Sequence, residues 1–211
     1  GLWNNANGAG INKYSDVVPT AGEQVWDDSD TDDNGIPTHE NDNMVGYNGT
    51  FGSIGVSLAY VNGGNGSTGG GASDSSWVVT YDGLIDGLTL GLGQGENRET
   101  QDLQTMYAKY TSDALTVAYQ MSDLDNTGST ADEEAIGIGA SFAINDNLSV
   151  SAGRHEVDMG AGKVDETSTG FSASYTSGGV TIGFVANSTE DVAGTAGSDD
   201  SYREVAISFA F

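Results

Sequence analysis

The last seven residues, Val205-Ala206-Ile207-Ser208-Phe209-Ala210-Phe211, alternate large apolar side chains with small or polar ones. Because successive side chains of a β-strand point to opposite faces, this period predicts a strand with one apolar and one polar face. An apolar face of this kind meets either the core of a soluble β-protein or the hydrocarbon of a membrane. The choice between these two solvents decides the fold.

The same alternation recurs along the chain from residue 43 onward. We expect about eleven strands, each close to the ~9–11 residues that a tilted membrane strand needs. The predicted spans are 43–50, 53–62, 75–82, 87–95, 101–111, 114–122, 133–143, 147–157, 167–176, 179–188 and 201–211. A two-sheet sandwich would show a similar alternation, so the period alone does not separate the two folds.

The connections between these strands alternate between short and long. Short turns are predicted at 51–52, 83–86, 112–113, 145–146 and 177–178. Long loops are predicted at 63–74, 123–132, 158–166 and 189–200, with one of intermediate length at 96–100. Outer-membrane barrels sort their loops in this way, because tight turns lie at the periplasmic end and longer loops at the extracellular end. The sequence therefore predicts an all-β, antiparallel transmembrane β-barrel, in which backbone polar groups are paired within the sheet.

The composition excludes several function classes. The chain has 31 Asp and Glu against 6 Lys and Arg, which gives a formal net charge of -25. Since nucleic-acid binding depends on Lys and Arg at the phosphates, this balance argues against a nucleic-acid partner. No arrangement of His, Ser and Asp stands out as catalytic, so we do not expect an enzyme.

Residues 1–42 lack the strand-like alternation and are rich in Asp. We therefore divide the chain into a long acidic loop, residues 1–42, and barrel strands with their turns and loops, residues 43–211. The first predicted strand, 43–50, is followed by a short turn. The acidic loop therefore lies at the long-loop end of the barrel.

The order of these features resembles the C-terminal portion of a Gram-negative general diffusion porin of the alpha-proteobacterial type. The resemblance rests on the acidic loop, the strand pair around 47–56, the repeated strand–turn–strand pattern and the terminal Phe211. It implies a sixteen-stranded barrel that assembles as a homotrimer, with the third extracellular loop folded inward to narrow the pore. Counting back from Phe211 makes residues 43–50 the sixth strand, so residues 1–42 look like the constriction loop. We expect either a fragment of a longer protein or, since bacterial barrels have even strand numbers, a small twelve-stranded barrel.

The resemblance also implies a set of pore residues. Carboxylates on the inward loop would face basic side chains on the wall, and the field between them would set the ion preference. The constriction candidates are Asp27, Asp28, Asp30, Asp32, Asp33 and Glu40. Strand parity places Tyr107, Lys109 and His155 on the lumen wall. A solvated acidic loop with no role in the pore is the alternative.

Two further features have chemical interpretations. The run Asp30-Thr31-Asp32-Asp33-Asn34-Gly35 matches the start of a calcium loop, with Asp30, Asp32 and Asn34 as ligands of Ca2+. Asn41 stands where the bidentate Glu of such a loop is expected, and chance in an Asp-rich stretch is the competing explanation. By the same resemblance, Phe211 belongs to the signal that the outer-membrane assembly machinery reads, or it is a lipid-facing girdle residue.

We therefore expect an integral protein of the bacterial outer membrane, in contact with its lipid. It would form a water-filled channel for passive diffusion of small hydrophilic solutes and ions, with a preference for cations because of the -25 charge. The alternatives are a smaller substrate-specific channel, a barrel that acts as an adhesin or surface receptor, and a secreted calcium-binding β-sandwich. No cofactor is required, and Ca2+ is the one candidate ion.

Overall fold

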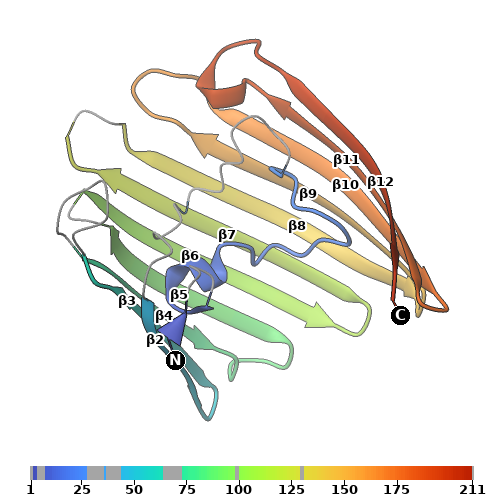
Figure 1. Ribbon diagram of the computed structural model, residues 1–211, viewed down its shortest axis with the longest axis horizontal. Helices are drawn as coiled ribbons and strands as arrows, with labels where there is room; N and C mark the ends of the chain where they lie inside the picture. The colour runs from blue at the N-terminus through green and yellow to red at the C-terminus, as the bar shows by residue number, and fades with distance from the viewer. Residues whose placement is uncertain are drawn as a thin grey trace.

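The computed structural model describes residues 2–3, 8–27, 36, 44–63, 73–97, 100–128 and 131–210. Within these ranges the chain forms one 12-stranded antiparallel sheet, in which each strand pairs with its neighbours in the sequence (Figure 1). The strands are β1 (Leu2–Trp3), β2 (Met44–Phe51), β3 (Ile54–Val61), β4 (Asp74–Tyr81), β5 (Leu88–Asn97), β6 (Gln101–Ser112), β7 (Leu115–Asn126), β8 (Glu133–Asn145), β9 (Leu148–Asp158), β10 (Glu166–Ser177), β11 (Val180–Glu190) and β12 (Asp200–Phe209). Two short 3-10 helices, η2 (Ile11–Tyr14) and η3 (Val192–Gly194), accompany them. None of the helices in the described ranges is long and apolar enough to cross a membrane.

The predicted all-β antiparallel fold is confirmed, in the form of an incomplete barrel, and the eleven predicted strands correspond to β2–β12. The largest difference is at β7, which was expected to end at residue 122 and extends to Asn126. There Asp123 and Asp125 break the apolar alternation, whereas the backbone pairing with β6 continues unchanged. β1 was not predicted, because two residues are too few to show a period. Among the described residues no pairing joins β12 to β1, so this part of the sheet is open.

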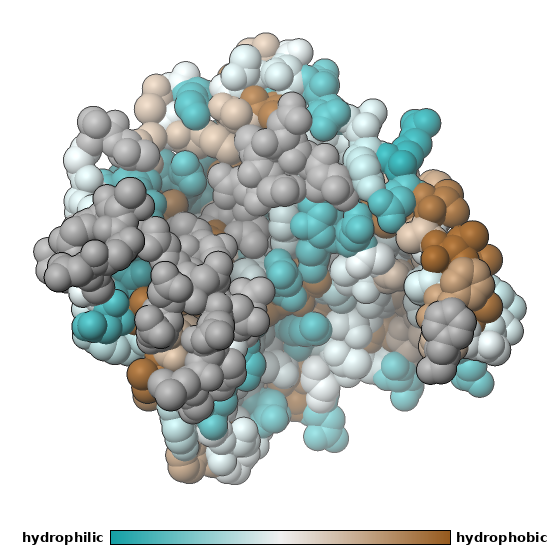
Figure 2. Space-filling view, viewed as in Figure 1, coloured by the Kyte–Doolittle hydropathy of each residue, from teal (hydrophilic) through white to brown (hydrophobic). Residues whose placement is uncertain are grey.

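The two faces of the sheet differ in composition, as the alternation predicts. Buried Ser and Thr side chains, such as Ser57, Thr105 and Ser172, line one face, which we call the inner face. Large apolar side chains cover the other, outer face and remain exposed, with Phe51 at 62% and Phe209 at 60%. Figure 2 shows the inner face, where hydrophilic and weakly polar residues predominate and apolar residues gather at the edge near β12. A single-layer sheet with an exposed apolar face is stable only where lipid covers that face.

The apolar band on the outer face runs obliquely to the strands. Met106, Met121 and Ile136 are register partners on β6, β7 and β8, and the same row reaches Glu156 on β9. On β12 the apolar residues lie several rows nearer the short turns, in Val205–Phe209. From β6 to β12 the apolar band therefore shifts toward the short-turn ends of the strands. This is the arrangement that strands tilted by ~35–45° in a bilayer require, because a level hydrocarbon layer cuts tilted strands at different heights.

Candidate functional site

Residues 8–27, which we call the inner segment, lie along the inner face of the sheet (Figure 1). Near the start of the segment, the Asn48 side chain on β2 donates to the Gly8 carbonyl oxygen at 2.9 Å. Near its end, the Asn187 side chain on β11 donates to the Gln24 carbonyl oxygen at 2.9 Å. The inner segment therefore crosses the inner face from β2 to β11.

Wall hydroxyl groups accept hydrogen bonds from three backbone amides of the inner segment. The Gly10 and Ile11 amides donate to the Oγ atoms of Ser57 at 2.8 Å and Ser76 at 3.0 Å. The Ala21 amide donates to Ser151 Oγ at 2.8 Å. Because the segment has no strand or α-helix partner for these buried groups, the wall hydroxyls supply the hydrogen bonds that folding requires.

Glycines in the wall leave room for the apolar side chains of the inner segment. A β-carbon at Gly139 on β8 would come within 2.6 Å of Val18 Cγ1. A β-carbon at Gly170 on β10 would come within 2.9 Å of Val25 Cγ1. The segment therefore approaches the wall more closely than any residue with a side chain would allow at these two positions.

Two aromatic contacts pack the inner segment against the wall. Tyr14 stacks on Tyr107 of β6, with ring centroids 5.9 Å apart and planes at 22°. Trp26 packs on His155 of β9, with ring centroids 4.6 Å apart. Burial raises the pKa of the Tyr14 phenol above its ordinary value, so this ring stays neutral in the stack.

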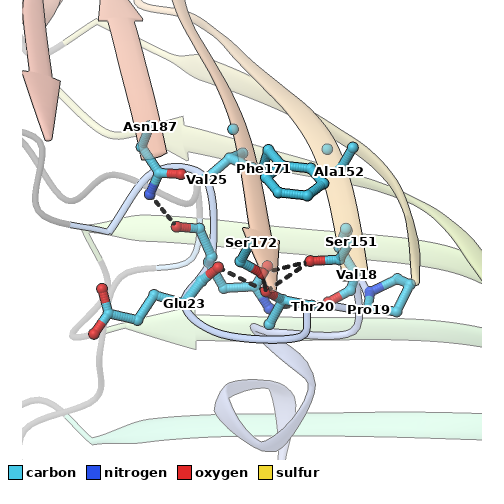
Figure 3. A pocket seen from close by; sticks show the side chains of 13 residues that line it. Val18, Pro19, Thr20, Glu23, Val25, Ser151, Ala152, Phe171, Ser172 and Asn187 are labelled. Atoms are coloured by element: carbon cyan, nitrogen blue, oxygen red, sulfur yellow. Dashed lines mark hydrogen bonds between the residues drawn. The ribbon is translucent and has the colours of Figure 1, made fainter. Parts of the chain in front are cut away.

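A turn at Thr20–Glu23 lies against β9, β10 and β11 (Figure 3). The Thr20 hydroxyl lies 3.4 Å from Ser151 Oγ and 3.2 Å from Ser172 Oγ, and these two serines are 2.6 Å apart. Thr20 also donates to the Glu23 carbonyl at 2.7 Å, which closes the turn. This hydroxyl cluster joins the segment to two strands at once.

The residues expected on the lumen wall have different surroundings. Tyr107 and His155 lie on the inner face, as their parity predicts, but the inner segment covers them and leaves them only 7% and 4% exposed. Lys109, two residues along β6 from Tyr107, lies on the same face and is partly exposed. Only Lys109 of the three is therefore placed to meet solvent on this face.

Of the acidic candidates, Asp27 alone falls within the described residues. Its carboxylate accepts a hydrogen bond from the Gln24 amide at 2.9 Å and holds the turn at the end of the inner segment. Ile36 is buried with Ile11 and Val78 on the inner face. The other candidates, Asp28, Asp30, Asp32, Asp33, Asn34, Glu40 and Phe211, lie outside the described residues. In the part of the chain that the structure describes, no group of three or more His, Asp or Glu could hold a metal ion.

Charged groups on the inner side are mainly acidic. On the strands, Asp74, Glu166, Asp200 and Glu204 face inward with the buried Ser and Thr side chains. Asp16, Glu23 and Asp27 belong to the inner segment. The basic side chains described on this side are Lys13, which donates to Asn48 Oδ1 at 3.1 Å, and Lys109. The inner side therefore carries a negative field, with two positive groups near the Tyr14–Tyr107 stack.

The amides that hold the segment, Asn48, Gln120 and Asn187, were not among the candidates from sequence. Gln120 on β7 donates to the Tyr14 carbonyl oxygen at 2.8 Å. The available signal is that each is a side-chain amide at an inward position, on a face where Gly, Ser, Thr and Ala are the commonest residues. This pattern identifies an inward polar side chain, but it does not identify the backbone group to which the side chain hydrogen-bonds.

Comparisons with solved structures show the fold. The chain is 18% identical to the "anion-selective porin from Comamonas acidovorans", with a TM-score of 0.67 over 92% of this chain and 66% of that one. A porin structure refined at 1.8 Å resolution gives a TM-score of 0.68 at 20% identity, over 92% of this chain and 72% of that one. Pseudomonas aeruginosa OccK3 (OpdO) gives a TM-score of 0.64 at 15% identity, over 80% of this chain. The chain spans 60% of the length of OccK3.

No curated protein matches the sequence. The family model described as "Gram-negative porin" matches residues 3–193, which is most of the chain. This match agrees with the exposed apolar outer face, the polar inner face and the solved structures that share the fold. The chain is therefore an integral outer-membrane protein that belongs to the Gram-negative porin family.

Proposed function

We propose that this chain forms the greater part of a general diffusion porin, through which small hydrophilic solutes and ions pass passively. The observation that carries the proposal is the inner segment, which crosses the inner face from β2 to β11 and is anchored at both ends. Inside a barrel, such a segment narrows the water-filled lumen. Residues 1–42 would then be the constriction loop, and residues 43–211 would supply eleven strands of the wall of a sixteen-stranded barrel.

The channel is proposed to prefer cations. Asp16 and Asp27 on the inner segment and Glu204 on β12 add to a field that Lys13 and Lys109 offset only in part. In a narrow lumen, charges that lie on the wall act on a permeating ion at short range, where salt screens them least. Asp28, Asp30, Asp32, Asp33 and Glu40 remain proposed constriction carboxylates.

The partners of the chain are proposed from its likeness to porins. A homotrimer is expected, and the structure titled "OmpT (in-vitro folded), an outer membrane protein Vibrio cholerae (trimer form)" shares the fold at 14% identity. Phe211 is proposed as part of the assembly signal. Calcium binding at Asp30, Asp32 and Asn34 is also proposed, and isothermal titration of the folded protein with Ca2+ tests it against an Asp30→Asn, Asp32→Asn variant.

Planar-bilayer recording tests the proposed function directly. The detergent-extracted protein is added to one side of a membrane that separates two potassium chloride concentrations. Insertions in groups of three, with a reversal potential that reports cation preference, are the expected result. Correctly folded protein that never conducts would contradict the channel and favour an adhesin or surface receptor. Conductance for one class of solute alone would favour a substrate-specific channel.

A further inference from the structure

We propose that Gln120 and Asn187, with a weaker contribution from Asn48, are positioning residues that clamp the inner segment to the wall and thereby set the channel width. The proposal rests on the proposed function only for the last step, from the position of the segment to the width of the channel. The clamp itself follows from hydrogen bonds that can be tested without any measurement of transport.

The three amides hold the segment at its start, middle and end. Asn48 binds the Gly8 carbonyl, Gln120 the Tyr14 carbonyl and Asn187 the Gln24 carbonyl, at 2.9, 2.8 and 2.9 Å. Each donor lies on a different strand, and each acceptor is a backbone oxygen. The clamp therefore fixes the path of the segment whatever side chains the segment presents to the lumen.

The clamping side chains are themselves held in place. Gln120 Nε2 also donates to Thr105 Oγ1 at 3.1 Å, and Thr105 lies 3.1 Å from Ser122 Oγ. Asn187 fits against Gly170, where a β-carbon would come within 2.1 Å of Asn187 Oδ1. Both amides are also buried, at 6% and 7% exposure. Buried, preoriented donors form stronger hydrogen bonds than exposed ones, because water does not compete for them.

Asn48 differs from the other two amides in its exposure. Its Oδ1 accepts from Ser57 Oγ at 2.7 Å, but the side chain lies where solvent reaches it. An exposed hydrogen bond exchanges with water at little net cost. We therefore expect the middle and end of the segment, at Tyr14 and Gln24, to depend on the clamp more than its start at Gly8.

Disulfide trapping measures the clamp directly, because the chain has no native cysteine. A β-carbon at Gly22 would lie 3.0 Å from the Ser172 β-carbon, so a small outward movement of the turn brings the two to the ~3.5–4.5 Å separation found in disulfides. The pair Gly22→Cys with Ser172→Cys should therefore cross-link under mild oxidation in the folded, membrane-inserted protein. Gly22→Cys with Ser174→Cys is the control pair, because Ser174 lies one step along the same face of β10.

Clamp variants are then made in the cross-linking background. Asn187→Leu keeps the approximate shape of the side chain and removes the donor without adding a charge, and Gln120→Ala removes the middle contact. Each should slow cross-linking between the two cysteines, and the double variant should slow it most. Ser141→Ala is the matched control, because Ser141 is the register partner of Ser151 on the inner face and has no hydrogen bond to the segment. Cross-linking at the parental rate in both clamp variants would overturn the clamp.

Measurements of conductance and polymer exclusion distinguish a failure of the clamp from a failure of the proposed function. In bilayers, Asn187→Leu and Gln120→Ala, neither of which adds a charge to the lumen, should raise single-channel conductance and admit larger neutral polyethylene glycols, whereas Ser141→Ala should leave both unchanged. Gly139→Ala should act in the opposite sense, because its methyl group displaces Val18 from the wall into the lumen. General destabilisation would not shift conductance in opposite directions in the clamp variants and in Gly139→Ala. If cross-linking slows but the largest polymer admitted stays the same, the clamp does not set the channel width. The proposed diffusion channel is not contradicted by that result.

Discussion

Tyr14 of the inner segment stacks on Tyr107 of β6, and the Tyr107 ring in turn occupies the space beside Gly91, where a β-carbon would lie 2.1 Å from its Cε1 atom. The wall residue is thus held between a glycine on the neighbouring strand and an aromatic ring of the segment. Gly91 and Tyr107 are register partners, so this contact is set by the pairing of β5 with β6. Lys13, the residue before Tyr14, has its Nζ atom 5.6 Å from the Tyr14 ring centroid.

This arrangement predicts the effect of truncating Tyr107. Tyr107→Ala should lower the free energy of unfolding by about 3–5 kcal/mol, because it removes a buried aromatic ring and the stack with it. Tyr107→Phe should change it by much less, because the ring and its packing remain. Urea unfolding of the protein in lipid vesicles, followed by tryptophan fluorescence, measures both. Equal losses in the two variants would mean that the hydroxyl group, and not the stack, is the stabilising feature.

The lipid contact of the outer face is tested by a charge in the apolar band. Val117 lies within the band on β7, whereas Asp123 lies beyond it on the same face. Val117→Lys should destabilise the folded protein by roughly 2–4 kcal/mol, whereas Asp123→Lys should not destabilise it, because Asp123 lies beyond the band and faces another carboxylate, Glu134. The same unfolding assay compares them. A neutral effect of Val117→Lys is what an exposed position in water would give, and it would contradict the membrane-spanning assignment.

Like charges lie side by side near the long-loop end of the outer face. Asp123, Glu134 and Asp158 are consecutive register partners on β7, β8 and β9. Because directly opposed like charges destabilise a sheet, Glu134→Gln should raise stability by about 0.2–1 kcal/mol at low salt. The gain should vanish at 1 M salt, where the Debye length is ~3 Å. Glu190→Gln is the control, since the β10 partner of Glu190 is Thr167. A gain that persists in high salt would contradict the electrostatic explanation.

Ion preference should respond to Lys109. Since this side chain is a positive group on the inner face, Lys109→Glu should shift the reversal potential further toward cation selectivity. Lys163→Glu makes the same charge change in the loop between β9 and β10 and should have a smaller effect. Planar-bilayer recording in a potassium chloride gradient gives both values. Equal shifts would indicate that net charge, and not position along the lumen, determines selectivity.

The sequence predicts the wall of this protein far better than the segment inside it. The strands β2–β12 can be predicted from the alternation of apolar and polar residues, because one face of the sheet contacts water or the inner segment and the other contacts lipid. The polarity of nearly every second residue therefore indicates the face on which it lies. The alternation fails where the outer face becomes polar, as at Asp123, because pairing of the backbone continues without apolar side chains. Parity also assigns Tyr107 and His155 to the inner face correctly.

The path of the inner segment has no comparable signal in the sequence. Its anchors bind backbone carbonyls of Gly8, Tyr14 and Gln24, and a backbone oxygen is the same at every residue. The wall glycines that receive Val18 and Val25 are only a few of the 32 glycines in the chain. Burial of Tyr107 and His155 beneath the segment therefore required the three-dimensional structure.

The proposed function requires that the inner segment lines and narrows the conducting pathway. Asp16 is exposed on this segment, and the chain has no native cysteine that would compete for a thiol reagent. Asp16→Cys is labelled with a bulky, uncharged thiol reagent during single-channel recording, with Ser177→Cys at the exposed end of β10 as the control. We expect a stepwise fall in current for Asp16→Cys and none for Ser177→Cys. Complete labelling of Asp16→Cys, verified by mass, with no change in current would contradict the claim.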